Sequence, residues 1–274
     1  MKVLFQIGPF AIYFFGFMIM IGAIVGMFVL KREAKRAGYN SEVILEGVVY
    51  ALISGIIGAR IFYIIFYNPV YYLNNPAEIF AIHQGGLSIH GGLVGGFLAA
   101  FWFLKKHKLS FLAVADLASP PLILAQAIAR TGCDVFGKPM ITPLPWGIIK
   151  DGVLVHPAQV YEFILNYLLF FYLWLRKGKI KYSGQLFGEY LIGYSLARGI
   201  VEFFRINPVI YPPFSISHLL SLGGILLGIL VILVSRKYKP SLNNVENKSY
   251  WGTALLSTII LTTLSIIIYY TVQG

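Results

Sequence analysis

Three side chains that can bind phosphate or move a proton lie near the ends of long apolar segments. Arg130 and Arg205 carry guanidinium groups, which bind phosphate oxygens through paired hydrogen bonds. His90 carries an imidazole that can take a proton near neutral pH. A charged side chain within a membrane-spanning segment costs at least about 2.5 kcal/mol, so it usually has a partner or a function. These residue types favour a lipid-phosphate site with a general base nearby.

Further polar residues follow the same apolar segments and extend the candidate set. Arg198 and Glu202 are four residues apart, so they can neutralise each other on one helix face. For Arg198 this structural role and a direct role in binding both stay open. Glu162 can pair with an arginine, and the arginines can also extend to the membrane surface. The other candidate substrate-binding residues are His156, Tyr161, Gly85, Gly91 and Gly92.

A glycine-rich segment, residues 85–96, surrounds His90. Small residues four positions apart favour close packing of membrane helices. Glycines also leave room for a bulky ligand or another backbone to approach the histidine. The two roles are compatible, so both are kept. The pairs with this spacing are Gly91/Gly95 and Gly92/Gly96.

The elements that must position these residues are predicted to be membrane helices. Of 274 residues, 58% are hydrophobic and 12% are charged, whereas a soluble chain has about twice that charged fraction. A helix crosses a bilayer with about 20 apolar residues, and several segments reach that length. They are too long and too uniformly apolar for the strands of a membrane barrel. We therefore expect an all-α polytopic membrane protein.

Eight spans are predicted, seven in a membrane core over residues 1–239 and one more after a polar linker, in residues 240–274. Basic residues follow the first apolar segment rather than precede it, which favours a retained span over a cleaved signal peptide. The extra span is interpreted as an appendage, so removal of residues 240–274 is expected to leave activity largely intact. The spans are expected near residues 10–30, 44–67, 86–104, 112–130, 156–175, 186–204, 214–235 and 251–271.

The basic residues set the expected orientation. A formal net charge of +11 can indicate nucleic-acid binding, but the charges lie in short clusters between apolar segments, so we expect no nucleic-acid partner. The positive-inside rule places these clusters in the cytoplasm and both termini outside. The candidate residues then lie near the outer ends of five spans, whereas Asp116 and Glu189 lie near inner ends. The clusters are Lys31/Arg32/Lys35/Arg36, Lys105/Lys106/Lys108, Arg176/Lys177/Lys179/Lys181 and Arg236/Lys237/Lys239/Lys248.

Five motifs, in order and with approximate spacing over residues 10–235, resemble those of the prolipoprotein diacylglyceryl transferase family. That resemblance implies a seven-span enzyme of the bacterial cytoplasmic (inner) membrane, with its active site on the extracytoplasmic side. It implies transfer of the diacylglyceryl group of phosphatidylglycerol to the lipobox cysteine of a preprolipoprotein, the first step of lipoprotein maturation. The products are a thioether and glycerol phosphate, and no cofactor or metal is implied. The motifs are residues 85–96, Ala129–Gly132, His156–Glu162, Arg198 and Glu202–Arg205.

The resemblance also implies roles for individual residues. His90 matches the family's essential histidine, and Arg130 and Arg205 match its essential arginines. Gly85 and Gly91 match glycines beside that histidine, and Glu202 matches a supporting carboxylate. A thiol with a pKa of about 8.5 is only a few per cent ionised at pH 7, so a base such as His90 can raise the reactive fraction. Which residue is the base stays open.

The chain departs from the family pattern at the segment after Arg130. The run from Cys133 to Gly137 is shorter than usual, and Cys133 stands where asparagine is common, while Asp134 can replace a missing carboxylate. A covalent role for Cys133 is disfavoured, because only Arg130 marks it as a low-pKa thiol. A tyrosine–glycine of the first span is replaced by Phe15-Gly16.

Other classes of function stay open. A transporter or lipid-binding protein is disfavoured, because no internal repeat is evident and the polar groups are expected at one face. A metal-dependent phosphotransferase needs clustered aspartates, which the sequence lacks. A diverged paralogue with an altered substrate or no activity remains an alternative because of the shortened segment after Arg130.

Overall fold

The computed structural model describes residues 2–8, 10–82, 85–237 and 251–273. Lys239 and Lys248 of the last basic cluster, and the linker before the last span, lie outside these residues. Eight long helices within the described residues correspond to the eight predicted spans, which confirms the all-α class. They are α1 (Phe14–Arg36), α2 (Ser41–Tyr67), α4 (Ile89–Lys106), α5 (Phe111–Thr131), α6 (Ala158–Arg176), α7 (Gln185–Glu202), α8 (Ile216–Ser235) and α9 (Trp251–Gln273).

Six of the described helices are long and apolar enough to cross a membrane: α1, α2, α5, α6, α8 and α9. Helices α4 and α7 are not among them. Three charged candidates lower the apolar character of α7, namely Glu189, Arg198 and Glu202, and α4 combines four glycines with two terminal lysines. The chain is thus a multi-pass membrane protein, and the crossing of α4 and α7 stays a prediction.

The first helix begins later than predicted. Residues 10–13, expected to open the first span, instead form β2 (Phe10–Tyr13), which pairs antiparallel with β1 (Val3–Ile7), with Phe5 opposite Ile12. Backbone pairing between these strands competes with helix formation before Phe14. The remaining short elements are α3 (Pro69–Asn74), the 3-10 helix η1 (Pro76–Phe80), and the antiparallel pairs β3 (Ile148–Lys150) with β4 (Val153–Val155) and β5 (Val209–Tyr211) with β6 (Phe214–Ser215).

The chain divides into two compact units. Unit 1 comprises residues 1–30 and 115–274, and unit 2 comprises residues 31–114. Each unit is described by itself. Helix α9 belongs to the same unit as α5, α6, α7 and α8, whereas the predicted division at residue 239 stays a prediction.

In unit 2, glycines let α2 and α4 pack backbone to backbone. A Cβ atom added to Gly95 would lie 2.5 Å from the carbonyl oxygen of Ser54, and one added to Gly58 would lie 2.5 Å from that of Gly91. No side chain fits at such distances. The packing role of the glycine segment, which the sequence left beside a binding role, is therefore present in the structure.

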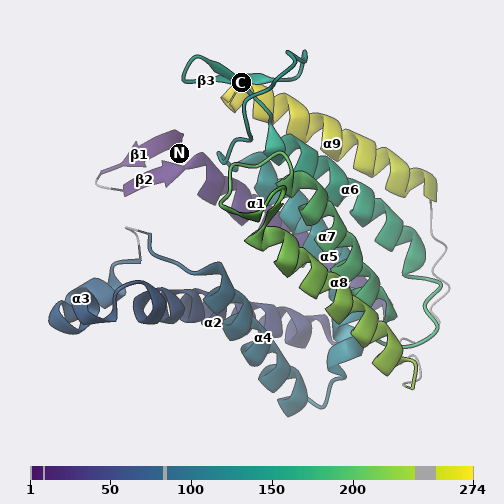
Figure 1. Cartoon of the computed structure of the whole chain (residues 1–274). Helices are drawn as coiled ribbons and strands as arrows, with labels where there is room; N and C mark the ends of the chain where they lie inside the picture. Colours follow the sequence, from purple (N-terminus) through teal and green to yellow (C-terminus); the bar gives the residue numbers. More distant parts are fainter. Residues whose placement is uncertain (1, 9, 83–84, 238–250, 274) are drawn as a thin grey trace. The chain divides into compact units, whose positions relative to one another are not determined.

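In unit 1, α6 supplies much of the core. Phe163, Tyr167 and Phe170 of α6 are buried with residues from α1, α5, α7 and α9. Helix α9, yellow in Figure 1, lies alongside α6 and runs antiparallel to it, because Tyr167 pairs with Ser265 at 2.8 Å while the earlier α6 residue Gln159 pairs with the later α9 residue Tyr269.

The two acidic residues expected near inner helix ends have structural partners. Asp116, which is fully buried, accepts hydrogen bonds from the backbone N–H groups of Gly184 (2.6 Å) and Phe187 (2.8 Å), so it caps the start of α7. Glu189 pairs with Arg176 through both carboxylate oxygens, at 2.7 and 3.1 Å. These groups are satisfied where they lie and hold the helix ends together.

Candidate functional site

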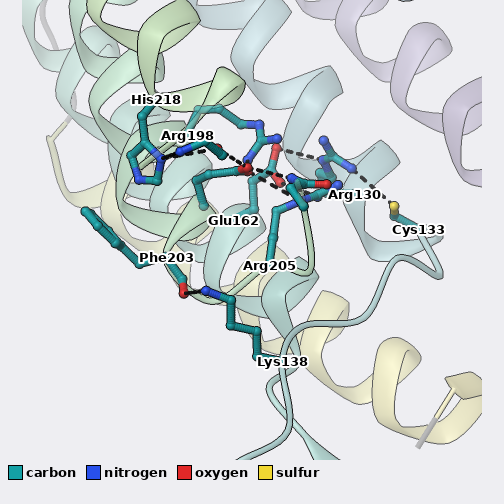
Figure 2. Close-up of polar contacts among 11 residues, drawn as sticks. Arg130, Cys133, Lys138, Glu162, Arg198, Phe203, Arg205 and His218 are labelled. Atoms are coloured by element: carbon teal, nitrogen blue, oxygen red, sulfur yellow. Dashed lines mark hydrogen bonds and ion pairs between the residues drawn. The ribbon is translucent and has the colours of Figure 1, made fainter. Parts of the chain in front are cut away.

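Arg130 begins a cluster of five charged side chains in unit 1. It lies in the last turn of α5, and its Nε donates to Glu162 Oε1 of α6 at 2.7 Å (Figure 2). The Glu162 side chain is only 1% exposed, whereas that of Arg130 is 25% exposed. The carboxylate is thus enclosed by protein, while part of the guanidinium can meet a ligand.

Arg205 lies between two carboxylates without a short contact to either. Its Nη1 is 3.9 Å from Glu162 Oε2, and its Nε is 3.7 Å from Glu202 Oε2. Both Arg205 Nε and Glu162 Oε2 are buried without a hydrogen-bond partner. Burial, together with the positive charges of Arg198 and Arg130, lowers the pKa of Arg205 from its usual value. Its charge is therefore poorly compensated, which suits a group that binds an anion.

Glu202 is held by three donors. Arg198 Nη1 donates to Oε2 at 2.7 Å, and the side chains of Asn207 and Ser215 each donate to Oε1 at 2.6 Å. The expected pairing of Arg198 with Glu202 is therefore confirmed. With three arginines against two carboxylates, the cluster has an excess of one positive charge. A low-polarity setting strengthens the attraction of that excess charge for an anion.

The shortened segment after Cys133 is tied to the backbone around Arg205. Gly137 N–H donates to the carbonyl of His156 at 2.8 Å, and Lys138 N–H donates to that of Phe204 at 2.7 Å. Gly137 also forms a bridge with Arg205. A Cβ atom at Gly137 would lie 2.7 Å from the His156 carbonyl oxygen, so this approach requires glycine. The segment thus helps to place Arg205.

Cys133 contacts the cluster directly. Arg130 Nη1 donates to its sulfur at 3.1 Å, and the cysteine is buried (Figure 2). The first residue of the shortened segment therefore has a polar contact with the arginine.

A second set of polar side chains lies at the start of α6. Tyr161 O–H is 3.1 Å from His156 Nδ1 and accepts a hydrogen bond from Trp146 Nε1 at 3.0 Å. The rings of His156 and Tyr161 each lie with their centres 5.1 Å from that of Phe204, which precedes Arg205. Burial lowers the pKa of His156, which lies before α6, so the neutral imidazole is favoured.

The remaining predicted residues lie in unit 2. His90 is exposed near the start of α4, where Gly91 is buried against α2. Gly85, with φ of +93°, and Gly86, with φ of +71°, adopt the left-handed conformation in the preceding loop. Arg60 anchors this loop, because its guanidinium donates to the carbonyls of Glu78 (2.5 Å), Ile79 (3.0 Å), Gly85 (2.9 Å) and Gly86 (3.0 Å).

The structure thus brings together Arg130, Glu162, Arg198, Glu202 and Arg205, with His156 and Tyr161 contacting Phe204. His90, Gly85, Gly91 and Gly92 have their neighbours in unit 2, and their functional roles stay predictions. Sequence reasoning missed Asn207, Ser215, His218 and Trp146. Two of these residues could have been found from the sequence, because a serine followed three positions later by a polar side chain, before an apolar segment, indicates a capping box. Ser215 and His218 form such a capping box at the start of α8. Among the described residues, no three His, Cys, Asp or Glu side chains gather as a metal site requires.

Comparisons with known proteins agree with the resemblance. A family model described as prolipoprotein diacylglyceryl transferase matches residues 2–234. A phosphatidylglycerol–prolipoprotein diacylglyceryl transferase of Clostridioides difficile (strain 630) is 36% identical over 250 residues, which cover 90% of this chain and 99% of that protein. Proteins of the same name from Bacillus mycoides (strain KBAB4) and Bacillus cereus (strain 03BB102) are each 36% identical over 251 residues, covering 86% of this chain and 92% of theirs.

Proposed function

The chain belongs to the prolipoprotein diacylglyceryl transferase family, and we propose that it transfers the diacylglyceryl group of phosphatidylglycerol to the cysteine thiol of a prolipoprotein. The match over residues 2–234 and the names of relatives that align over nearly their whole length support this activity. The lipobox cysteine of a preprolipoprotein is the proposed acceptor. The proposed location is the bacterial cytoplasmic membrane, with the site facing outward.

One observation carries the proposal, the cluster of three arginines around two buried carboxylates. Its excess positive charge suits the phosphate of a lipid head group. The Arg130 guanidinium is partly exposed, so it can bind phosphate oxygens, and Arg205 adds a second, poorly compensated positive charge to the cluster. Glu162 keeps the guanidinium of Arg130 oriented, and Glu202 keeps that of Arg198 oriented. The diester would then be held with its glyceryl carbon beside the site.

The proposed reaction forms one bond and breaks one. The thiolate sulfur attacks the glyceryl carbon that bears the phosphate, a C–S bond forms, and the C–O bond to the phosphate breaks. The phosphate leaves with the bonding electrons as glycerol phosphate, and the thiol proton passes to a base. Arginines already aimed at the leaving phosphate stabilise the charge that develops on it. We assign the base to His90 from the sequence match alone.

The proposal is tested with purified protein in detergent, phosphatidylglycerol labelled in its acyl chains, and a peptide that contains a lipobox cysteine. Transfer of label to the peptide is expected, and a peptide with serine in place of the cysteine is the control. Arg130→Lys keeps the charge but removes the planar fork and the Nε contact with Glu162, so transfer should fall sharply. Lipid binding without transfer would indicate a lipid-binding protein or an inactive paralogue. Undiminished transfer by Arg130→Ala would refute the assignment of the cluster.

Orientation has its own test. A single cysteine placed at residue 105, 106 or 108 should resist an impermeant thiol reagent in intact cells, because this basic loop is expected in the cytoplasm. Cys133 is buried, so it gives little background labelling. Rapid labelling of the loop in intact cells would reverse the proposed orientation.

A further inference from the structure

Helix α9 lies beyond the family match, which ends at residue 234, yet it makes polar contacts with the part of unit 1 that holds the candidate site. Tyr269 is fully buried, and its hydroxyl donates to Oε1 of Gln159, which is 1% exposed, at 3.1 Å. Gln159 lies one turn before Glu162 on α6. Helix α9 is thus joined by a buried hydrogen bond to the turn of α6 that also carries Glu162.

Tyr270 makes the second contact. Its hydroxyl donates to the backbone carbonyl of Trp146 at 2.6 Å. Trp146 lies in the loop before β3, where 46% of the residue is exposed. The bond from α9 is made to the backbone of Trp146, so it restricts the position from which the indole projects. Figure 1 shows the end of α9 beside the β3 hairpin.

From Trp146 the contacts lead to His156. An indole N–H can only donate, so the hydroxyl of Tyr161 accepts from it at 3.0 Å. The same hydroxyl lies 3.1 Å from His156 Nδ1. The backbone of His156 in turn bonds to Gly137 and Lys138, and Gly137 bridges to Arg205. An ordered Trp146 therefore acts on groups next to the arginine cluster.

We propose that α9 is a positioning element of the candidate site, in which Tyr270 holds Trp146 so that Trp146 and Tyr161 orient His156. In this arrangement the Tyr161 oxygen accepts from the indole N–H, and the tyrosine proton is assigned to the contact with His156 Nδ1. Neutral His156 then carries its own proton on Nε2 and presents that nitrogen as a donor. The hydrogen bond from Tyr269 to Gln159 fixes the position of α9 along α6. The effect on catalysis rests on the proposed function, whereas the ordering of Trp146 does not.

The first test measures the environment of Trp146. In a background with Trp102, Trp174 and Trp251 replaced by Phe, Trp146 is the only fluorophore of its kind. Tyr270→Phe removes one hydroxyl and keeps the ring, so the fold is retained. We expect a red-shifted emission and faster quenching by acrylamide. Ile267→Ala, at an exposed position near the same helix end, is the matched control and should change neither. Emission and quenching unchanged by Tyr270→Phe would overturn the proposal.

The second test is a double-mutant cycle on transfer. Tyr270→Phe should raise KM for the lipid by about 3- to 10-fold with little change in kcat, as expected for loss of one hydrogen bond that positions a binding group. In a Tyr161→Phe background the same change should have no further effect, because the route to His156 is already broken. If Tyr270→Phe raises KM equally with and without Tyr161→Phe, α9 has a merely structural role. The same conclusion follows if Tyr270→Phe lowers kcat as much as it raises KM and also lowers the thermal stability of the protein. If the wild-type protein transfers no lipid, the proposed function fails, and the fluorescence test still decides the positioning.

Discussion

Removing the charge of Glu162 should destabilise the protein strongly, and an anionic lipid should reverse part of the loss. Glu162→Gln keeps the shape of the side chain but leaves Arg130, Arg198 and Arg205 with Glu202 as the single carboxylate of the cluster. Breaking a buried ion pair costs about 3–5 kcal/mol, because the remaining charge stays buried without compensation. Arg130 is a quarter exposed, so water screens part of its charge and the lower end, about 3 kcal/mol, is expected.

The same reasoning sets the size of the rescue. A ligand that binds only the folded protein stabilises it by about 2.7 kcal/mol at 100 times its Kd. Phosphatidylglycerol supplies the missing negative charge, so it should bind the variant more tightly than the wild type and stabilise it more. The assay is chemical unfolding in detergent micelles with and without phosphatidylglycerol, with phosphatidylcholine as the neutral comparison.

Glu189→Gln is the matched control for this experiment. It breaks a pair with Arg176 of similar geometry, at the other end of α6 from Glu162. Phosphatidylglycerol should not restore its stability selectively. The reasoning would be refuted if phosphatidylglycerol stabilised both variants equally. It would also be refuted if Glu162→Gln lowered the free energy of unfolding by less than about 1 kcal/mol, which is the contribution of an exposed ion pair.

Three further predictions concern packing, pH and the last helix. Gly91→Ala should lower the free energy of unfolding by about 1–3 kcal/mol, because the new Cβ would lie 2.5 Å from that of Phe62. The control Gly92→Ala places its Cβ no closer than 3.6 Å to any atom, so it should leave the free energy of unfolding unchanged. Loss of transfer in Gly92→Ala, with stability unchanged, would indicate a binding role for Gly92. Because the pKa of His156 is lower in the folded protein than in the unfolded chain, the unfolded chain binds a proton at this residue first as the pH falls. The free energy of unfolding should therefore decrease as the pH falls below about 6.5. His156→Asn should show a smaller decrease over the same pH range. Removal of residues 240–274 should lower the rate of transfer in membranes that contain normal levels of the protein, because the hydrogen bonds of Tyr269 and Tyr270 are lost. This differs from the expectation from sequence. Full activity of the shortened protein would support the interpretation of the last span as an appendage.

The amino-acid sequence determined the class of the protein and the order of its spans. Apolar length, basic clusters and spacing are local properties, so they predicted eight helices whose ends differ from the structure by a few residues. The same spacing placed Arg198 and Glu202 on one helix face, and the structure contains that pair. The hairpin before Phe14 was missed because the pairing of β1 with β2 depends on contacts that apolar composition does not encode.

Tertiary structure decided which partner each charged group has. Arg130 and Arg205 were predicted alike as phosphate ligands, but Arg130 has a short contact with Glu162, whereas Arg205 lies between two carboxylates without a short contact to either. Residues far apart in the chain make these contacts, and their geometry depends on how helices pack. Hydropathy also could not distinguish a separate last span from one that hydrogen-bonds to Gln159 and to the backbone of Trp146, because two tyrosine hydroxyls make that difference.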